Sequence, residues 1–147
     1  MKIAIGNDHI GIELKTVVIE ELEKRQIDLI DCGTDSSQRA DYPEFAEKVA
    51  NLVAKGDADM GIVLCGTGVG VSIAANKVNG IRCVCCSEPY SAKMSREHND
   101  SNVLAMGSRV VGKELARMIV NEWLDGVYEG DRHQKRIDLI KDIEKRQ

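Results

Sequence analysis

The 147-residue sequence predicts a doubly wound α/β fold, a Rossmann-like three-layer α/β/α sandwich around a five-stranded parallel sheet. Two observations support this prediction: short, almost wholly apolar runs that suit strands buried on both faces, and a stretch of helical period after each run. Strands that alternate with helices along a chain form parallel sheets covered on both sides. The length corresponds to one domain over residues 1–147, and 43% hydrophobic residues suffice for a packed core.

The expected strands and helices alternate along the whole chain. We expect strands at residues 2–6, 27–33, 58–65, 80–85 and 102–107. In the first helix, Leu14, Val18 and Leu22 recur at helical spacing and form an apolar face. The second helix ends at Gly56, a residue type that commonly terminates helices. We expect helices at residues 12–25, 42–56, 72–78, 87–99, 111–126 and 131–146.

Charge and hydropathy exclude several classes of protein. The 24 acidic residues outnumber the 20 basic ones and give a net charge of −4, whereas nucleic-acid-binding domains usually carry a basic excess. No run approaches the roughly 18 apolar residues of a membrane span, and the apolar run near the N-terminus is too short for a signal peptide. We therefore expect a cytoplasmic protein that binds neither nucleic acid nor membranes.

The cysteines and histidines argue against disulfides and against a metal site. Five cysteines, an odd number, are typical of a reducing compartment rather than of a disulfide framework. Cys83, Cys85 and Cys86 fall in a strand-like run without the paired spacing of a zinc site. The three histidines are scattered along the chain. We therefore expect no metal.

A glycine-rich segment, residues 65–72 (CGTGVGVS), lies between the third strand and the following helix. In open parallel sheets, ligands bind beyond the carboxyl ends of the strands, where this segment falls. Glycines at such a position let backbone N–H groups converge on an anion at a helix N-terminus. The alternative is a tight turn that binds nothing.

Three familiar phosphate motifs fail at single positions. A dinucleotide fingerprint needs a third glycine where Val71 stands, and a cysteine phosphatase needs an arginine at that same position. Residues 107–114 match a Walker A motif until Glu114, which replaces the Ser or Thr that would hold magnesium. A carboxylate beside phosphates would repel them, so we interpret this segment as an ordinary helix start.

Cys65 remains as the candidate reactive group of the glycine-rich segment. A cysteine at a strand end, directly before a helix, is in a setting that stabilises the thiolate. Such a thiolate could act as a nucleophile or as a base, and the neighbouring amides would stabilise an oxyanion. The alternative is a small buried hydrophobic residue, which is our interpretation of the four other cysteines, Cys32, Cys83, Cys85 and Cys86.

Other polar residues follow strands or end helices near the predicted ligand side. Asp8 and His9 end the first strand, and Arg109 follows the fifth. His98 and Asn99 end the short helix before that strand. The histidines either carry out acid–base or phosphate-binding work or serve as surface and capping residues.

Two further arginines lie on the last helix. Arg132 and Arg136 are four residues apart and therefore share one helix face. Two guanidinium groups so placed could clamp a phosphate. Spacing alone favours the alternative, a solvated helix face.

Taken together, these segments resemble the ribose-5-phosphate isomerase B family, within a wider group that includes allose- and galactose-phosphate isomerases. The resemblance covers essentially the whole chain. It is carried by GNDHIG, DYPEFA, CGTGVGVSIAANK, CSEPYSAKMSREHNDSNVLAMGSR and YEGDRHQKRI.

The resemblance implies an aldose–ketose isomerase that interconverts D-ribose 5-phosphate and D-ribulose 5-phosphate without a cofactor. Cys65 would move a proton between C1 and C2 through a cis-enediolate. His98 would open the sugar ring with help from Asp8, and Asn99 would bind the sugar. The oxyanion would be held by the turn that contains Gly66, Thr67, Gly68, Val69 and Gly70. The phosphate would be surrounded by His9, Arg109, Arg132 and Arg136.

The resemblance also implies a homo-oligomer, a dimer or a tetramer, with the active site between subunits. The C-terminal helix, about residues 131–146, would reach a neighbouring subunit. Three alternatives stay open: a six-carbon aldose phosphate such as allose 6-phosphate or a rare free aldose as substrate, a non-catalytic phosphosugar-binding subunit, and a nucleotide-binding domain. The failed dinucleotide fingerprint argues against the last of these.

Overall fold

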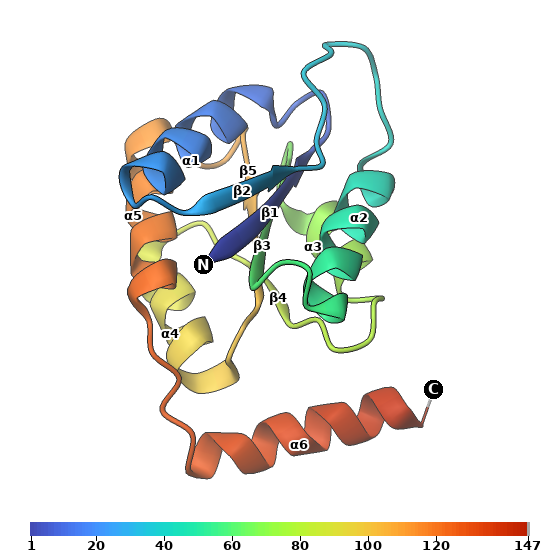
Figure 1. Ribbon diagram of the computed structural model, residues 1–147, viewed down its shortest axis with the longest axis vertical. Helices are drawn as coiled ribbons and strands as arrows, with labels where there is room; N and C mark the ends of the chain where they lie inside the picture. Colours follow the sequence, from blue (N-terminus) through green and yellow to red (C-terminus); the bar gives the residue numbers. More distant parts are fainter. Residues whose placement is uncertain (147) are drawn as a thin grey trace.

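The computed structural model describes residues 1–146 and contains one five-stranded sheet (Figure 1). All strand pairs are parallel, and the strand order is β2-β1-β3-β5-β4. The strands are β1 (Lys2–Asn7), β2 (Asp28–Asp31), β3 (Met60–Cys65), β4 (Cys83–Cys85) and β5 (Val103–Gly107). The predicted α/β fold with a five-stranded parallel sheet is therefore confirmed.

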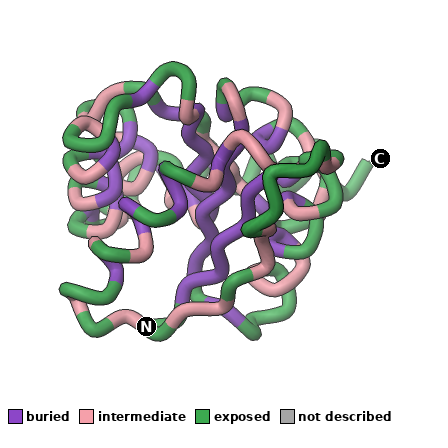
Figure 2. The backbone as a smooth tube through the Cα atoms, turned by 90° about the horizontal axis from the view of Figure 1, so that it is seen from above, coloured by how far each residue is buried: buried purple, intermediate pink, exposed green. Residues whose placement is uncertain are grey.

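Six helices accompany the sheet. They are α1 (Ile12–Lys24), α2 (Tyr42–Lys55), α3 (Val69–Ala75), α4 (Pro89–Asn99), α5 (Lys113–Asp125) and α6 (Arg132–Lys145). Helices α1, α4 and α5 cover one face of the sheet, and α2 and α3 cover the other. The strands form the buried centre of the molecule in the view from above (Figure 2).

Most predicted boundaries lie within two residues of those observed, and the larger differences are at β2, β4 and α3. Strand β2 covers Asp28–Asp31 instead of residues 27–33. Strand β4 has three residues instead of six. Before it, the Gly80 carbonyl and the Arg82 N–H bond to the Asn102 side chain, and the Ile81 N–H bonds back to the Val78 carbonyl. Helix α3 begins at Val69, inside the glycine-rich segment, and not at residue 72. The glycine-rich segment after β3 is therefore a tight loop of three residues, 66–68, that leads directly into α3.

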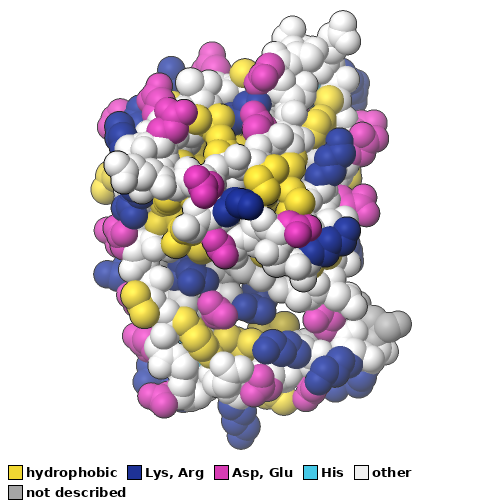
Figure 3. Space-filling model, in the orientation of Figure 1, with side chains coloured by type: hydrophobic (Ala, Val, Ile, Leu, Met, Phe, Trp, Pro, Cys, Tyr) yellow, Lys and Arg dark blue, Asp and Glu magenta, His cyan; other side chains and the backbone are white. Residues whose placement is uncertain are grey.

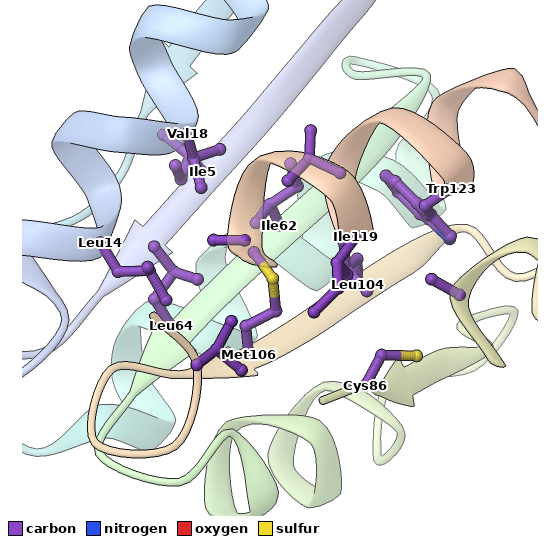
Figure 4. Packing of buried hydrophobic residues seen from close by; sticks show 14 of the residues in the cluster. Ile5, Leu14, Val18, Ile62, Leu64, Cys86, Leu104, Met106, Ile119 and Trp123 are labelled. Atoms are coloured by element: carbon purple, nitrogen blue, oxygen red, sulfur yellow. The ribbon is translucent and has the colours of Figure 1, made fainter. Parts of the chain in front are cut away.

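The two faces of the sheet are packed with side chains of different size. On the face under α1, α4 and α5, large residues such as Ile5 and Leu104 pack with Trp123 (Figure 4). Burial of each such side chain stabilises the fold by about 1.5–3 kcal/mol. The face under α2 and α3 includes the small residues Ala4 and Ala105, which leave room for those two helices to approach the sheet closely.

Strand order places the carboxyl ends of β1 and β3 side by side. From β1 the chain crosses to β2 on one side of it and then returns to β3 on the other. This change of direction is the position at which open α/β sheets bind ligands. Asp8 follows β1 there, and Cys65 ends β3.

Gly68 gives the turn after β3 its shape. It is the N-cap of α3 and has φ of +79°, and its N–H donates to Cys65 Sγ at 3.1 Å. A Cβ atom at this position would lie 2.9 Å from the Met106 carbonyl carbon and from Cys85 Sγ. The turn therefore requires glycine for its backbone conformation and for its close approach to β5.

Helix α6 lies across one end of the molecule, outside the two helix layers (Figure 1), and its Glu144 carboxylate accepts from the Gly80 N–H at 2.7 Å. His133 and Ile137 are buried, whereas Leu139, Ile140 and Ile143 are exposed. Figure 3 shows hydrophobic side chains along the hollow between this helix and the body. None of the helices within residues 1–146 is long and apolar enough to cross a membrane.

An ion-pair network between α1 and α5 predicts a pH dependence of stability. Arg117 bonds to Glu21 at 2.8 Å, and Asn121 donates to Glu21 at 3.2 Å. These bonds outweigh the effect of burial and lower the pKa of Glu21 from 4.5 to about 2. Because the folded pKa is depressed, this stabilisation is present above the ordinary pKa and is lost as pH falls through about 2.

We therefore expect Glu21→Gln to lower the free energy of unfolding at neutral pH, and the difference from wild type to shrink as pH falls from 4.5 toward 2. Urea unfolding of both proteins at several pH values across this range measures the difference in the free energy of unfolding. Glu23→Gln, at an exposed position of the same helix, is the matched control. A difference that stays constant down to the lowest pH would contradict this assignment.

Gly68→Ala should destabilise the protein more than a substitution at another left-handed glycine. The left-handed backbone costs a residue with a Cβ roughly 1–2 kcal/mol, and at Gly68 the contacts with β5 add to this cost. Gly56 has φ of +78°, and a Cβ at that position would have no neighbour within 4 Å, so Gly56→Ala shows the backbone cost alone. Equal losses in denaturant unfolding would show that the contact with β5 is unimportant.

Candidate active site

A cleft of about 640 Å³ lies at the carboxyl ends of β1 and β3. It is lined by Asp8, His9, Ile10, Arg39, Tyr42, Cys65, Gly66, Thr67, Val69, Gly70, Ile73 and Arg109. Most of the residues predicted from strand ends and from the glycine-rich segment therefore meet in one place. Gly68 lies in the same turn, between Thr67 and Val69.

Cys65 lies at the floor of the cleft and is 5% exposed. The N–H of Gly68 donates to its sulfur, which fixes the side chain beside the start of α3. Thr67 Oγ1 accepts a bond from the Val69 N–H at 3.3 Å. Backbone amides and a thiol thus lie side by side, an arrangement that can remove a proton and stabilise the oxyanion that results.

The four other cysteines are held as neutral thiols. Burial raises the pKa of Cys86 to about 12, and it raises the pKa of Cys83 still further. Burial is also the main reason why the pKa values of Cys32 and Cys85 are raised. The expectation that these four are small buried residues is confirmed for Cys86, whereas Cys32 and Cys83 are half-buried and Cys85 is exposed, so for Cys85 it is wrong.

Asp8 and His9 are fixed by bonds to backbone amides. Asp8 Oδ1 accepts from the N–H groups of Ile10 at 2.9 Å and Gly11 at 3.1 Å, which closes the turn between β1 and α1. His9 Nδ1 accepts from the N–H of Ala40 at 3.2 Å. This bond selects the tautomer of neutral His9 that carries its proton on Nε2. His9 is thereby prepared to donate a hydrogen bond to an anion.

Tyr42 and Arg109 close two sides of the cleft. The Tyr42 ring packs so closely on Gly70 that a Cβ there would lie 2.6 Å from the ring. The Arg109 side chain passes over Gly66, where a Cβ would lie 3.7 Å from Arg109 Cδ. The backbone N–H of Arg109 donates to the Gly66 carbonyl at 3.0 Å and ties the two loops together.

Four predicted site residues do not reach this cleft within one chain. His98 and Asn99 are the last residues of α4, and Arg132 and Arg136 lie on α6. Helix α4 runs back from the carboxyl end of β4 toward the amino ends of the strands, so its last residues lie far from Cys65. Within one chain the predicted site residues therefore form two groups. The first group lines the cleft, and the second lies at the end of α4 and on α6.

The second group is organised around His133, which was not among the residues predicted from the sequence. The rings of His98 and His133 stack with centroids 4.3 Å apart and planes 8° from parallel. Glu129 Oε2 lies 3.4 Å from His133 Nε2 and 4.0 Å from His98 Nε2. Burial, followed by the proximity of the His98 and Arg132 side chains, lowers the pKa of His133.

The cluster of His98, Glu129 and His133 does not have the geometry of a metal site. Its ligand atoms lie within 4.8 Å of one another. Because the two rings are stacked in parallel planes, their nitrogen lone pairs, which lie in those planes, do not point toward one position. We assign no metal to this cluster.

Arg39 and Tyr42 line the cleft but were not predicted from the sequence. Arg39 lies in the long connection between β2 and α2, and Tyr42 is the first residue of α2; the residue pattern did not indicate the path of this connection. One signal was present, because Tyr42 begins the YPEFA part of the DYPEFA segment that carries the family resemblance. The place of that segment in the fold could not be deduced from the sequence.

Comparisons with known proteins show the family to which the chain belongs. A family model described as Ribose/Galactose Isomerase matches residues 3–140. The chain is 60% identical to ribose-5-phosphate isomerase B of Escherichia coli K12, over 99% of this chain and 97% of that protein. It is 49% identical to a putative sugar phosphate isomerase of Bacillus subtilis, over 99% of both chains.

Solved structures show the same relationship. Ribose-5-phosphate isomerase B of Clostridium thermocellum superposes with a TM-score of 0.97 at 53% identity, over 99% of each chain. That of Mycoplasma genitalium, solved with bound ribulose-5-phosphate, gives 0.94 at 40% identity, over 99% of this chain and 97% of that one. The expected resemblance is confirmed: the chain belongs to the ribose/galactose isomerase family and is an isomerase of the ribose-5-phosphate isomerase B type.

Proposed function

We propose that the protein interconverts D-ribose 5-phosphate and D-ribulose 5-phosphate, with Cys65 as the base. The observation that carries this proposal is the position of the Cys65 thiol beside the turn amides in a cleft. The 60% identical relative named ribose-5-phosphate isomerase B supports the choice of substrate. So does the M. genitalium relative, which binds the product of this reaction.

The proposed reaction transfers one proton between neighbouring carbons. The Cys65 thiolate takes the proton from C2 of the open-chain aldose, and the C–H electron pair forms the C1–C2 double bond of a cis-enediolate. Negative charge develops on O1, where amides of residues 66–70, with the Thr67 hydroxyl nearby, stabilise it. The O2 proton moves to O1, Cys65 returns its proton to C1, and C2 becomes the ketose carbonyl.

We further propose a homo-oligomer, a dimer or a tetramer, in which the second group of one subunit completes the cleft of its neighbour. Within one chain, His98, Asn99, Arg132 and Arg136 are distant from Cys65, and α6 lies across the end of the molecule away from the cleft. In the completed site, His98 carries protons for ring opening with Asp8, and Asn99 binds the sugar. His9 and Arg109 of one subunit bind the phosphate together with Arg132 and Arg136 of the other.

We place the protein in the cytoplasm. All five cysteines are free thiols, which is typical of a reducing compartment. The proposed reaction also needs Cys65 reduced, because a disulfide cannot act as a base.

Replacing the base should abolish turnover and leave binding intact. For Cys65→Ala we expect kcat to fall by about 10²–10⁴-fold or more, the usual contribution of a positioned base, with ribose 5-phosphate binding by calorimetry retained. Cys32→Ala removes a thiol outside the cleft and serves as control. A fully active Cys65→Ala enzyme would rule out the base assignment.

Mixing two inactive variants tests the shared site. Subunits with Cys65→Ala and subunits with Arg136→Ala should regain activity after exchange, because each mixed pair contains one cleft with both residues intact. Mixing Cys65→Ala subunits with a Cys65→Ala/Arg136→Ala double variant cannot build such a cleft and is the control. If mass spectrometry shows mixed pairs and activity stays absent, the site is not shared.

Substrate length is the open part of this proposal. A relative named D-erythrulose-4-phosphate isomerase is 39% identical over 95% of the chain, so proteins this similar act on sugars of other lengths. Comparing kcat/KM for five- and six-carbon aldose phosphates and free aldoses decides the question. Ribose 5-phosphate should give the highest value; a higher value for allose 6-phosphate or for a free aldose would replace it as the substrate.

A further inference from the structure

The β2–α2 loop, residues 32–41, places the side chain of Arg39 in the cleft, and the mechanism proposed above gives this arginine no role. Arg39 lines the cleft with His9 and Tyr42. Its side chain is exposed, and among residues 1–146 it makes no hydrogen bond or ion pair. An unpaired guanidinium beside a donor such as His9 is suited to bind an anion.

The first half of this loop is locked to the body of the protein by a buried lysine. Lys15 Nζ, on α1, lies 3.0 Å from Asp31 Oδ2 and 2.6 Å from Asp35 Oδ1, and its side chain is 4% exposed. It also donates to the Thr34 carbonyl at 3.3 Å. The same carbonyl accepts from Asn7 Nδ2 at 2.8 Å, which joins the loop to β1.

The second half of the loop is fixed directly at the cleft. The N–H of Ala40, the residue after Arg39, donates to His9 Nδ1. Tyr42, two residues further on, packs against Gly70 of the catalytic turn. The backbone of Arg39 therefore lies at the cleft before any ligand binds, so little backbone ordering is needed when it contacts one.

We propose that Arg39 binds the terminal phosphate of the substrate beside His9 and thereby sets the preference for phosphorylated over free aldoses. His9 in the tautomer fixed by Ala40 offers one donor and no charge. A phosphate dianion is bound more strongly where a cation lies next to that donor, and the planar guanidinium supplies two parallel N–H groups. This inference rests on the isomerase function proposed above.

Replacing Arg39 should affect phosphate binding and leave the proton-transfer step unchanged. For Arg39→Ala we expect KM for ribose 5-phosphate, and the inhibition constant of inorganic phosphate, to rise about tenfold, the usual loss for one charged hydrogen bond. We expect kcat to stay within about twofold, because Arg39 contacts no reacting carbon. Arg39→Lys keeps the positive charge but lacks the two parallel N–H groups of the guanidinium. Its KM and inhibition constant should therefore lie between those of wild type and those of Arg39→Ala.

Lys55→Ala is the matched control, because Lys55 is exposed and lies at the far end of α2 from the cleft. It removes the same charge and should leave both constants unchanged. If Arg39→Ala leaves both constants at the wild-type value while wild type isomerises ribose 5-phosphate, the role of Arg39 is wrong and the proposed function stands. If wild type has no isomerase activity, the proposed function itself fails.

A double variant tests how the loop acts. The Asp35 side chain is 86% exposed, so Asp35→Asn loosens the Lys15 anchor without leaving a buried carboxylate unpaired. It should raise KM for ribose 5-phosphate in wild type and have little further effect in Arg39→Ala. If Asp35→Asn raises KM by the same factor in Arg39→Ala as in wild type, Asp35 acts independently of Arg39. That result would overturn the inference that the Lys15 anchor acts by positioning Arg39.

Discussion

The left-handed conformation of Gly68 is the constraint on which the rest of the site depends. It brings the chain back over the end of β5 and aims its own N–H at the Cys65 sulfur. Because the turn is this tight, α3 starts at Val69 and its first amides lie beside the thiol. A side chain at position 68 would meet the Met106 backbone, so neither the turn nor the placement of the amides survives substitution easily.

The parallel sheet explains why the predicted site residues of one chain fall into two separate groups. Strand ends of one subunit supply Asp8, His9 and Cys65 at one edge. A helix that runs back from the carboxyl ends of the strands ends near their amino ends, so His98 and Asn99, the last residues of α4, lie at the opposite end of the sheet. In the proposed assembly a two-fold axis removes this separation. It sets the carboxyl ends of the strands of one subunit against the opposite end of the other subunit's sheet.

The sequence predicted those parts of the fold and site that depend on local pattern. Buried strands and their order along the chain follow from apolar runs, and Asp8, His9 and Cys65 could be selected because they end such runs. The spacing of Arg132 and Arg136 could not show what they contact, since a solvated helix face has the same spacing. The resemblance to a family, and not the residue pattern, gave them a role.

Other features depend on contacts between distant segments and were missed. Arg39 reaches the cleft because Lys15, on another element, fixes the loop that carries it. The stacking of His98 on His133 requires α6 to pack near the end of α4. Just before β4, the Gly80 carbonyl and the Arg82 N–H bond to the Asn102 side chain, a contact between segments twenty residues apart. None of these contacts leaves a periodic signal in the sequence.

The central claim is that a base, held beside the turn amides, moves a proton through an enediolate. Its most direct test is isomerisation of ribose 5-phosphate in D₂O over many turnovers at equilibrium, with both sugars examined by NMR. We expect deuterium to accumulate at C1 of ribulose 5-phosphate and at C2 of ribose 5-phosphate, because a proton held on the base exchanges with solvent in a fraction of turnovers. Sugars that interconvert at the normal rate and still carry only protium at these carbons after many turnovers would indicate direct hydride transfer and would contradict the claim.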